Sequence, residues 1–293
     1  MKNIYSLAIC FLITTTTCFA EISKKERKAL EELYLSTNGM HWVRKWDLKS
    51  PVSTWYGVKI EGDKVTELNL FHNNLMGPLP EKLGDLEHLK VLNLAFNSIT
   101  GNLPEGLLAL TNLTVLKLEM NRLNGEIPSG IGALRQLEEL SAFNNFLTGE
   151  IPQSVGQLTN LKVLNLSSNA FYGRIPHAIG DLVQLETLGL FENKLQGFIP
   201  REIGNLSNLK ELVMANNQLE GAIPDEFSQL ASLEVFQIQN NNFSSFKALE
   251  FLETREYLVF DYDNKERRID FKDIKFSKTK MADTKFEEIE EQE

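Results

Sequence analysis

Residues 89–112 read LKVLNLAFNSITGNLPEGLLALTN, and this block is one of seven consecutive blocks of 24 residues that follow one another without insertion or deletion. Superposed, the blocks read L-x-x-L-x-L-x-x-N-x-L-x-G-x-I-P-x-x-L-G-x-L-x-x. A fixed period of this length predicts a solenoid, in which each block forms one coil and packs against its neighbours. The blocks begin at Val65, Leu89, Leu113, Leu137, Leu161, Leu185 and Leu209, and a degraded eighth block begins at Leu233.

The first half of each block has the pattern of a short strand. Positions 4 and 6 are apolar and flank a variable residue, as in Leu92-Asn93-Leu94. This period-2 alternation predicts a half-buried strand in every block. Stacked in parallel about 4.8 Å apart, the strands would form a sheet roughly 35 Å long.

Position 9 is Asn in all eight blocks. Where a strand turns sharply inward, its backbone N–H and C=O groups lose their partners, and an amide side chain can satisfy both kinds of group. We therefore expect a ladder of buried amides along the stack. Its members are Asn73, Asn97, Asn121, Asn145, Asn169, Asn193, Asn217 and Asn241.

The second half of each block is equally regular, with Gly at position 13 and Pro at position 16 in seven blocks. Gly permits a backbone turn that a side chain would block. Pro fixes φ and cannot continue a strand, so the chain must bend into a segment on the convex side. The apolar residues at positions 11, 15, 19 and 22 are expected in the shared core.

This L-x-G-x-I-P pattern resembles the plant-type class of leucine-rich repeat, found in plant receptor ectodomains, in inhibitor-like secreted proteins and in secreted bacterial proteins. The resemblance covers residues 54 to about 242. It implies an α/β repeat solenoid, a leucine-rich-repeat superhelix with one parallel β-strand per 24-residue repeat and a cap at each end. It is specific for the fold and says little about the ligand.

Residues 1–20 have the features of a secretory signal peptide cleaved after Ala20: a positive Lys2 and a mostly apolar run from Ile4 to Ile13. The alternative, a membrane anchor, needs a longer run of ~18–20 apolar residues. Lipidation at Cys18 is a further alternative, although three threonines before it are a poor context. We therefore predict a secreted or cell-surface protein with no membrane span in the mature chain.

Both cysteines, Cys10 and Cys18, lie in this segment, so the mature chain would have no disulfide. Plant members of the class usually carry a cysteine pair in the N-terminal cap, and Ile60 stands where a cysteine would follow the W-x-G-V motif. The order L-Y-x-S-T-N-G-x-x-W…W-x-G-V is similar to the cap of secreted bacterial members. The resemblance therefore implies a bacterial rather than a plant protein.

Residues 21–64 are predicted to form the N-terminal cap. Ser23 to Glu26 is a capping-box pattern that begins a helix, and Asn38-Gly39 ends it. A strand over Tyr56–Ile60 should then turn onto the first repeat. All three tryptophans of the chain lie in this cap, and we expect a lid over the open end of the core; the alternative is an aromatic platform for a ligand. They are Trp42, Trp46 and Trp55.

The repeats are predicted to span 65–242 and a C-terminal cap 243–262, with a short helix from Ser245 to Glu253 and an edge strand over Tyr257–Phe260. Such a cap is needed because the last repeat would otherwise end in an open sheet edge. Residues 263–293 form a charged tail with an apolar residue at every fifth place, typical of a pentapeptide-repeat tract. A disordered tail or a frayed helix is the alternative. The apolar residues are Phe271, Phe276, Met281 and Phe286.

Composition and motifs exclude several function classes. The formal net charge of −10 disfavours nucleic acid and anionic membranes as partners. The four histidines have no metal-ligand spacing, and the sequence has neither a P-loop nor a nucleophile elbow. We therefore predict neither an enzyme nor a resident cofactor or metal.

The variable strand positions 3, 5, 7 and 8 would form the concave surface, where an aromatic stripe is predicted to bind a ligand. The alternative is that the rings only stack as neighbours along the sheet. The leading interpretation is an extracellular, monomeric recognition protein for a protein or glycan, acting in adhesion; an inhibitor of a secreted hydrolase is the alternative. The candidate residues are Phe71, Phe96, Met120, Phe143 and Phe191 in the stripe, with Lys117, Glu119, Glu139, Asn165 and Glu192 around it.

Overall fold

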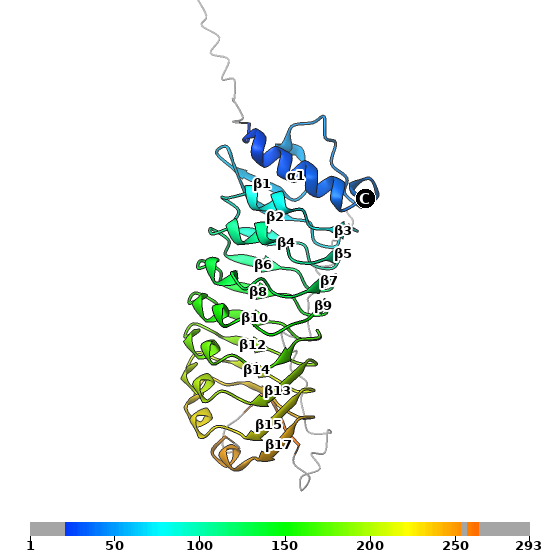
Figure 1. Cartoon of the computed structure of the whole chain (residues 1–293). Helices are drawn as coiled ribbons and strands as arrows, with labels where there is room; N and C mark the ends of the chain where they lie inside the picture. The colour runs from blue at the N-terminus through cyan, green and yellow to red at the C-terminus, as the bar shows by residue number, and fades with distance from the viewer. Residues whose placement is uncertain (1–20, 253–256, 264–293) are drawn as a thin grey trace, which may run out of the picture.

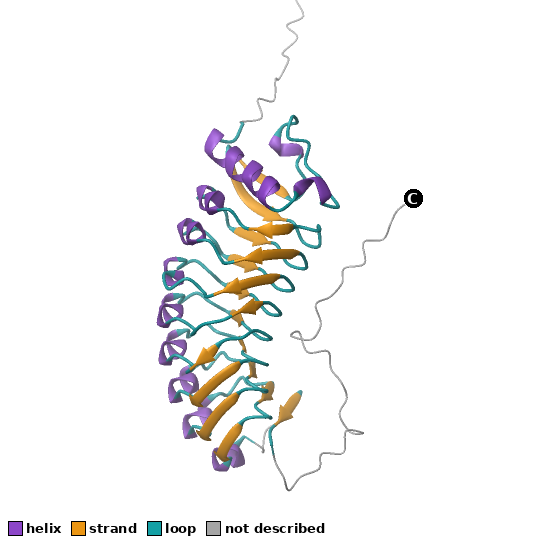
Figure 2. Ribbon diagram, turned by 45° about the vertical axis from the view of Figure 1, so that its right-hand side comes forward, coloured by secondary structure: helices purple, strands orange, loops and turns teal. Residues whose placement is uncertain are grey.

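The computed structural model describes residues 21–252 and 257–263, which form one elongated, curved stack of coils (Figure 1). Strands line the inner side of the curve and short helical segments line the outer side (Figure 2). The expected leucine-rich-repeat solenoid with one parallel strand per repeat is therefore confirmed. Among the described residues, no helix is long and apolar enough to cross a membrane.

The main sheet has ten strands, and all pairs are parallel except the first, β1 with β2. Equivalent repeat positions pair across the coils, so that Leu68 lies beside Leu92 and Leu92 beside Leu116. Every inward leucine therefore contacts its counterpart in the next coil. The strands are β1 Val58–Glu61, β2 Lys64–Asn69, β4 Val91–Asn93, β6 Val115–Lys117, β8 Glu139–Ser141, β10 Val163–Asn165, β12 Thr187–Gly189, β14 Glu211–Val213, β16 Val235–Gln237 and β18 Val259–Asp261.

The expected asparagine ladder is present and ties each coil to the one before it. Asn121 Oδ1 accepts from the backbone N–H of Ile99 at 2.9 Å. Its Nδ2 donates to the carbonyl of Leu94 in the preceding coil at 2.9 Å and to Leu118 in its own coil at 3.0 Å. An apolar residue could not satisfy both donors and acceptors, which explains why the position never varies.

A second set of strands at positions 10–14 was not predicted. Alternate residues in these strands are buried, as in Lys194–Phe198, so the N-x-L-x-G segment itself carries a period-2 signal. Each coil pairs with its neighbours through these strands before the chain turns at the repeat glycine. The glycine φ lies between 75° and 83° in the six repeats from Gly101 to Gly221. The strands are β3 Met76–Pro78, β5 Ser98–Gly101, β7 Arg122–Gly125 and β9 Phe146–Leu147 in one sheet, and β11 Tyr172–Gly173, β13 Lys194–Phe198, β15 Gln218–Ala222 and β17 Asn242–Ser245 in another.

The convex side consists of single 3₁₀ turns, most of which begin after the repeat proline. Pro152, for example, has extended φ and ψ of −69° and 142° immediately before such a turn. The proline therefore bends the chain as predicted. The turns are η3 Glu81–Asp85, η4 Glu105–Ala109, η5 Ile131–Ala133, η6 Gln153–Gln157, η7 His177–Asp181, η8 Arg201–Asn205, η9 Asp225–Gln229 and η10 Lys247–Phe251.

The N-terminal end is closed by helix α1 (Lys24–Ser36), the 3₁₀ turns η1 (Gly39–His41) and η2 (Val52–Thr54), and the three tryptophans. Ser23 and Glu26 form the predicted capping box. Trp42, Trp46 and Trp55 are each at most 4% exposed. They therefore form a lid, and the alternative of a ligand platform is wrong.

The C-terminal end differs from expectation in two details. The predicted helix begins only at Lys247 and is a 3₁₀ turn, because β17 extends through Ser245. The expected edge strand lies at Val259–Asp261 and pairs with β16 at the 24-residue spacing of the repeats, so it is the strand of a ninth coil. The predicted signal peptide and pentapeptide-like tract lie outside the described residues.

Candidate functional site

The concave face of the main sheet is built from positions 3, 5 and 7 of each strand, because positions 4 and 6 point into the core. Position 8 follows at the edge and adopts the left-handed conformation in every repeat, with φ of 58° at Phe96 and 53° at Glu192. A bulky residue rarely adopts this conformation. The repeat geometry therefore holds position-8 side chains at the rim of the face in one fixed direction.

Two predicted phenylalanines meet at the N-terminal part of this face. The rings of Phe71 and Phe96 lie 5.2 Å apart at 57°. Phe71 is 38% exposed and Phe96 is half-buried. Adjacent coils thus place two rings against each other while one of them remains accessible to a ligand.

The other members of the predicted stripe lie further along the stack and are half-buried: Met120, Phe143 and Phe191. Met120 Sδ accepts from the Asn144 amide of the next coil at 2.6 Å. These side chains lie outside the core, a position that both ligand binding and stacking along the sheet allow. That they bind a ligand stays a prediction.

Three of the predicted polar residues are accessible and paired. Lys117 Nζ and Glu139 Oε1 form an ion pair at 3.1 Å between neighbouring strands β6 and β8. Glu192 is exposed and accepts from Ser168 Oγ at 2.9 Å. These pairs lie within reach of a partner on the open side of the sheet.

Glu119 and Asn165 were expected in an exposed surround, and this expectation is wrong. Glu119 is only 6% exposed and Asn165 only 8%. Asn165 Oδ1 accepts from the backbone N–H of Ser167 at 3.1 Å, so the amide is used within its own strand. Burial raises the pKa of the Glu119 carboxyl, against the opposing effects of its own N–H, the Ser141 hydroxyl and Lys117.

The sequence interpretation missed three small residues that shape the middle of the face: Ser141, Ser167 and Gly189. A Cβ on Gly189 would lie 2.6 Å from Asn165 Oδ1 and 2.9 Å from Ser167 Oγ. The Asn165 amide and the Ser167 hydroxyl thus occupy the space that a side chain at position 189 would need, and only glycine fits there without a shift. The signal was available at position 5, where Gly189 is the one glycine in the eight blocks.

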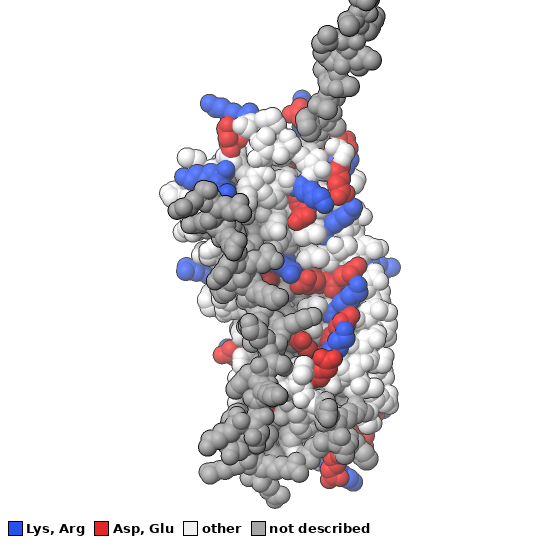
Figure 3. All heavy atoms as spheres, turned by 180° about the vertical axis from the view of Figure 1, so that it is seen from behind, with Lys and Arg blue, Asp and Glu red and all other residues white. Residues whose placement is uncertain are grey.

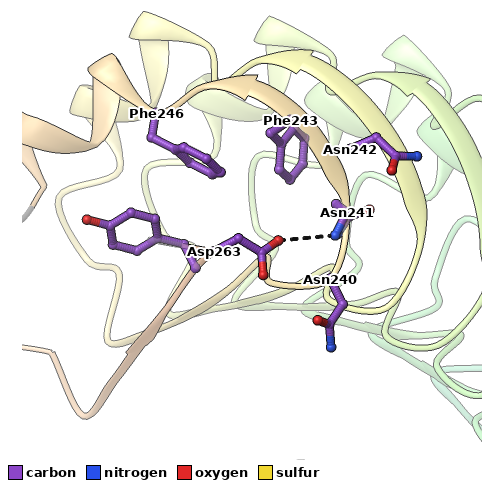
Figure 4. A pocket seen from close by; sticks show the side chains of 7 residues that line it. Asn240, Asn241, Asn242, Phe243, Phe246 and Asp263 are labelled. Atoms are coloured by element: carbon purple, nitrogen blue, oxygen red, sulfur yellow. Dashed lines mark hydrogen bonds between the residues drawn. The ribbon is translucent and has the colours of Figure 1, made fainter. Parts of the chain in front are cut away.

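A hollow of approximately 780 Å³ at the C-terminal end was also not predicted (Figure 4). Rings from Phe243, Phe246 and Tyr262 line it together with amides and one carboxylate. Asp263 Oδ2 accepts from the backbone N–H of Asn241 at 3.3 Å, so this carboxylate acts at the end of the asparagine ladder. Among the described residues, the hollow thus lies at the C-terminal end of the stack. The other lining residues are Asn240 and Asn242.

Basic and acidic side chains alternate along the stack (Figure 3). Charges also alternate at position 2 of successive repeats, where Lys162 pairs with Glu138 at 2.7 Å and Lys210 with Glu186 at 2.6 Å. These pairs join neighbouring coils and are exposed, so each contributes little stability. In the part of the chain that the structure describes, no three His, Cys, Asp or Glu side chains are grouped to hold a metal ion.

A long curved parallel sheet, with repeated core positions and variable residues on its inner surface, defines a repeat solenoid. The chain belongs to the leucine-rich-repeat proteins. A family model described as "Leucine-rich repeat region" matches residues 68–172, and one described as "Leucine Rich Repeat" matches residues 184–206 and 208–230.

The relatives include plant proteins and a leucine-rich-repeat protein of Leptospira interrogans, which matches with a TM-score of 0.54 at 37% identity over 62% of this chain and 45% of that one. Polygalacturonase inhibitor 1 of Arabidopsis thaliana is 30% identical over 99 residues, which are 31% of this chain and 30% of that protein. The ectodomain of the receptor kinase GASSHO1/SCHENGEN3 from Arabidopsis thaliana, solved with CASPARIAN STRIP INTEGRITY FACTOR 2, superposes with a TM-score of 0.74 at 32% identity. The match covers 81% of this chain and 30% of that one.

The Arabidopsis receptor kinase HAESA ectodomain, solved with an IDA peptide hormone ligand, matches with a TM-score of 0.69 at 30% identity. That match covers 82% of this chain and 41% of the HAESA chain. The chain therefore spans about a third of the length of the first relatives that it matches.

Proposed function

We propose that the chain is a non-catalytic, extracellular recognition protein that binds a peptide or protein on its concave face. The observation that carries the proposal is the row of Phe71, Phe96, Phe143 and Phe191, which lie on the ligand-accessible side of the sheet rather than in the core. Half-buried aromatic side chains are typical anchors of a protein interface. Support also comes from HAESA, a similar ectodomain solved with a peptide ligand.

The proposed setting is outside the cell or at its surface, with adhesion as the finer biological role. The expected signal peptide and the extracellular relatives support this location. A bacterial source, a monomeric state and a glycan as an alternative ligand are further parts of the proposal. A glycan array and a sedimentation experiment on the purified chain would test the last two.

The test of the concave face is a double variant, Phe143→Ser with Phe191→Ser. We expect it to fold normally and to lose at least tenfold in affinity for peptides selected from a random library by the wild-type protein. The matched control is Phe146→Ser with Phe198→Ser, because these rings are 64% and 62% exposed on the second set of strands. Equal affinity of the two double variants would refute the proposed face.

A second candidate function is inhibition of a secreted polysaccharide hydrolase, which the similarity to polygalacturonase inhibitor 1 favours. An inhibitor must lower the rate of its target enzyme at stoichiometric concentrations, whereas a recognition protein need not. Assaying polygalacturonases in the presence of the purified chain separates the two functions. Inhibition that disappears in the Phe143→Ser, Phe191→Ser variant would mean that recognition and inhibition use the same concave face.

A further inference from the structure

Glu119 carries a buried acceptor that the protein itself does not use. Its carboxylate accepts from its own backbone N–H and from the Ser141 hydroxyl. Oε2 is buried and has no hydrogen-bond partner among the described residues. A buried carboxylate oxygen without a donor is unfavourable, so its presence on a proposed binding face calls for an explanation.

The surrounding charges do not neutralise this carboxylate. Lys117 is the nearest cation, but its ammonium group pairs with Glu139 at 3.1 Å. Glu139 in turn disfavours ionisation of Glu119, so the two acids share one lysine. The middle of the face therefore has an excess of negative charge that a cationic group could balance.

A second unused polar atom lies two coils further along. Ser167 Oγ is buried and without a hydrogen-bond partner among the described residues, and the residue is 8% exposed. Position 7 of the intervening coil is Phe143, and position 7 of the following coil is Phe191, so polar and aromatic residues alternate: Glu119, Phe143, Ser167, Phe191. Two strand spacings separate Glu119 from Ser167, roughly 10 Å, which is the length of about three residues of extended peptide.

We infer that Glu119 is a specificity-determining residue that accepts a Lys or Arg side chain of the bound peptide, while Ser167 bonds a polar group about three residues away. This inference rests on the proposed function and names the ligand chemistry of the same face. The aliphatic stem of a Lys or Arg would cover the half-buried Phe143 ring while its head group reaches Glu119 Oε2. A peptide with a neutral side chain there would leave the carboxylate unpaired and bind more weakly.

The test selects peptides from a random library on the full-length wild-type protein and on Glu119→Gln, which keeps the size of the side chain. In the wild-type pool we expect at least tenfold enrichment of Lys or Arg at one aligned position, and in the Glu119→Gln pool we expect none. The matched control is Glu150→Gln, an exposed acid outside the concave face, whose pool should keep the enrichment. Melting temperature verifies that each variant is folded.

A thermodynamic cycle then measures the contact between Glu119 and the basic side chain of the peptide. The best wild-type peptide and its Arg→Gln or Lys→Gln analogue are titrated against wild type and Glu119→Gln by calorimetry. We expect the analogue to lose at least tenfold in affinity for wild type and less than twofold for the variant.

Three results would overturn the inference. They are the absence of basic enrichment in a wild-type pool that still depends on Phe143 and Phe191, basic enrichment that survives Glu119→Gln, and enrichment that Glu150→Gln also removes. The first of these leaves the proposed function standing. A wild-type pool that is insensitive to Phe143→Ser with Phe191→Ser would instead refute the proposed function itself.

Discussion

At the N-terminal end of the stack, helix α1 and three buried tryptophans cover the first coil. At the C-terminal end, the rings that the structure describes on the last coil are half-buried. The tryptophan Nε1 groups all donate to backbone carbonyls: Trp42 to Thr37 at 3.0 Å, Trp46 to Tyr56 at 2.8 Å and Trp55 to Asp47 at 3.0 Å. At the other end Phe246, Phe260 and Tyr262 are only partly buried.

Hydrogen bonding shows the same asymmetry. Arg44 N–H donates to Asn73 Oδ1 at 2.6 Å, so the cap supplies the backbone that a preceding coil would supply. Buried Glu26 accepts from the N–H of Val65 at 3.1 Å. At the C-terminal end, the half-buried Asp263 accepts from Asn241 at 3.3 Å. Because each coil is stabilised by its neighbours, unfolding should begin at the C-terminal end and spread through the stack.

The largest effect should follow removal of the best-packed ring at the N-terminal end. Trp42→Ala leaves a cavity between Tyr34 and Trp46, whose rings lie 5.0 and 4.9 Å from it. We expect a loss of about 3–5 kcal/mol in the free energy of unfolding, measured by urea denaturation. Phe260→Ala at the other end should cost less, because that ring is only half-buried. The control Val43→Ala changes a residue that is 66% exposed and should have almost no effect.

The next largest loss of stability is expected at Asn121 in the middle of the asparagine ladder, compared with Asn241 at its end. Asn121→Ala leaves the N–H of Ile99 without its side-chain acceptor and takes one of two amide donors from each of the carbonyls of Leu94 and Leu118. We expect a loss of roughly 1–3 kcal/mol, mainly from the buried N–H. Asn241→Ala should cost less, because groups near the open end can be hydrated. Asn124→Ala, an exposed residue in the same coil as Asn121, is the control. Equal losses at Asn121 and Asn241 would contradict the asymmetry.

A smaller effect on stability is expected from Glu26 and Asp263, the side chains that accept a backbone N–H at the two ends of the stack. Glu26→Ala removes a buried carboxylate that joins the capping box to Val65, and we expect a loss of about 1–3 kcal/mol. Asp263→Ala removes one long hydrogen bond, and we expect about 0.5–1 kcal/mol. Hydrogen exchange at the amides of Val65 and Asn241 reports each contact. A loss for Asp263→Ala as large as the loss for Glu26→Ala would contradict the asymmetry between the two ends.

The sequence predicts what the 24-residue period determines. Because equivalent positions recur at a constant spacing, the register of the strands, the asparagine ladder and the proline bends follow from one block. The tryptophan lid was also predictable, since a solenoid needs its open end covered by apolar side chains. Strand β18 was placed in the cap rather than in a ninth coil because Phe260 and Tyr262 stand at its inward positions in place of leucine.

The candidate site was less predictable, because it depends on neighbours in other coils. Position 7 identifies Glu119 as a concave residue, but its burial depends on Ser141 and Phe143 in the next coil. The same holds for Asn165 beside Ser167 and Gly189. The pattern within one repeat therefore predicts which face a side chain is on, and only the stacked structure shows how exposed that side chain is.

The smallest effects concern pH, and they should have opposite signs at the two ends. At the C-terminal end, burial and the nearby Asp263 raise the pKa of Asp261 above its ordinary value of 3.8. The folded state thus binds this proton more tightly than the unfolded state, and stability falls as pH rises from about 3.8 through the folded pKa. Asp261→Asn should therefore raise the melting temperature relative to wild type more at pH 7 than at pH 4.

At the N-terminal end, hydrogen bonds from the Ser50 hydroxyl and the Lys49 N–H lower the pKa of Asp47 below 3.8. Here the stabilising contribution is present above the unfolded pKa and is lost as pH falls through the folded pKa. Asp47→Asn should therefore lower the melting temperature slightly at pH 7, and the difference from wild type should shrink as the pH falls below about 3.8. Calorimetric scans of both variants across this range measure the two slopes. Slopes of the same sign would contradict the opposite pKa shifts of the hydrogen-bonded Asp47 and the half-buried Asp261.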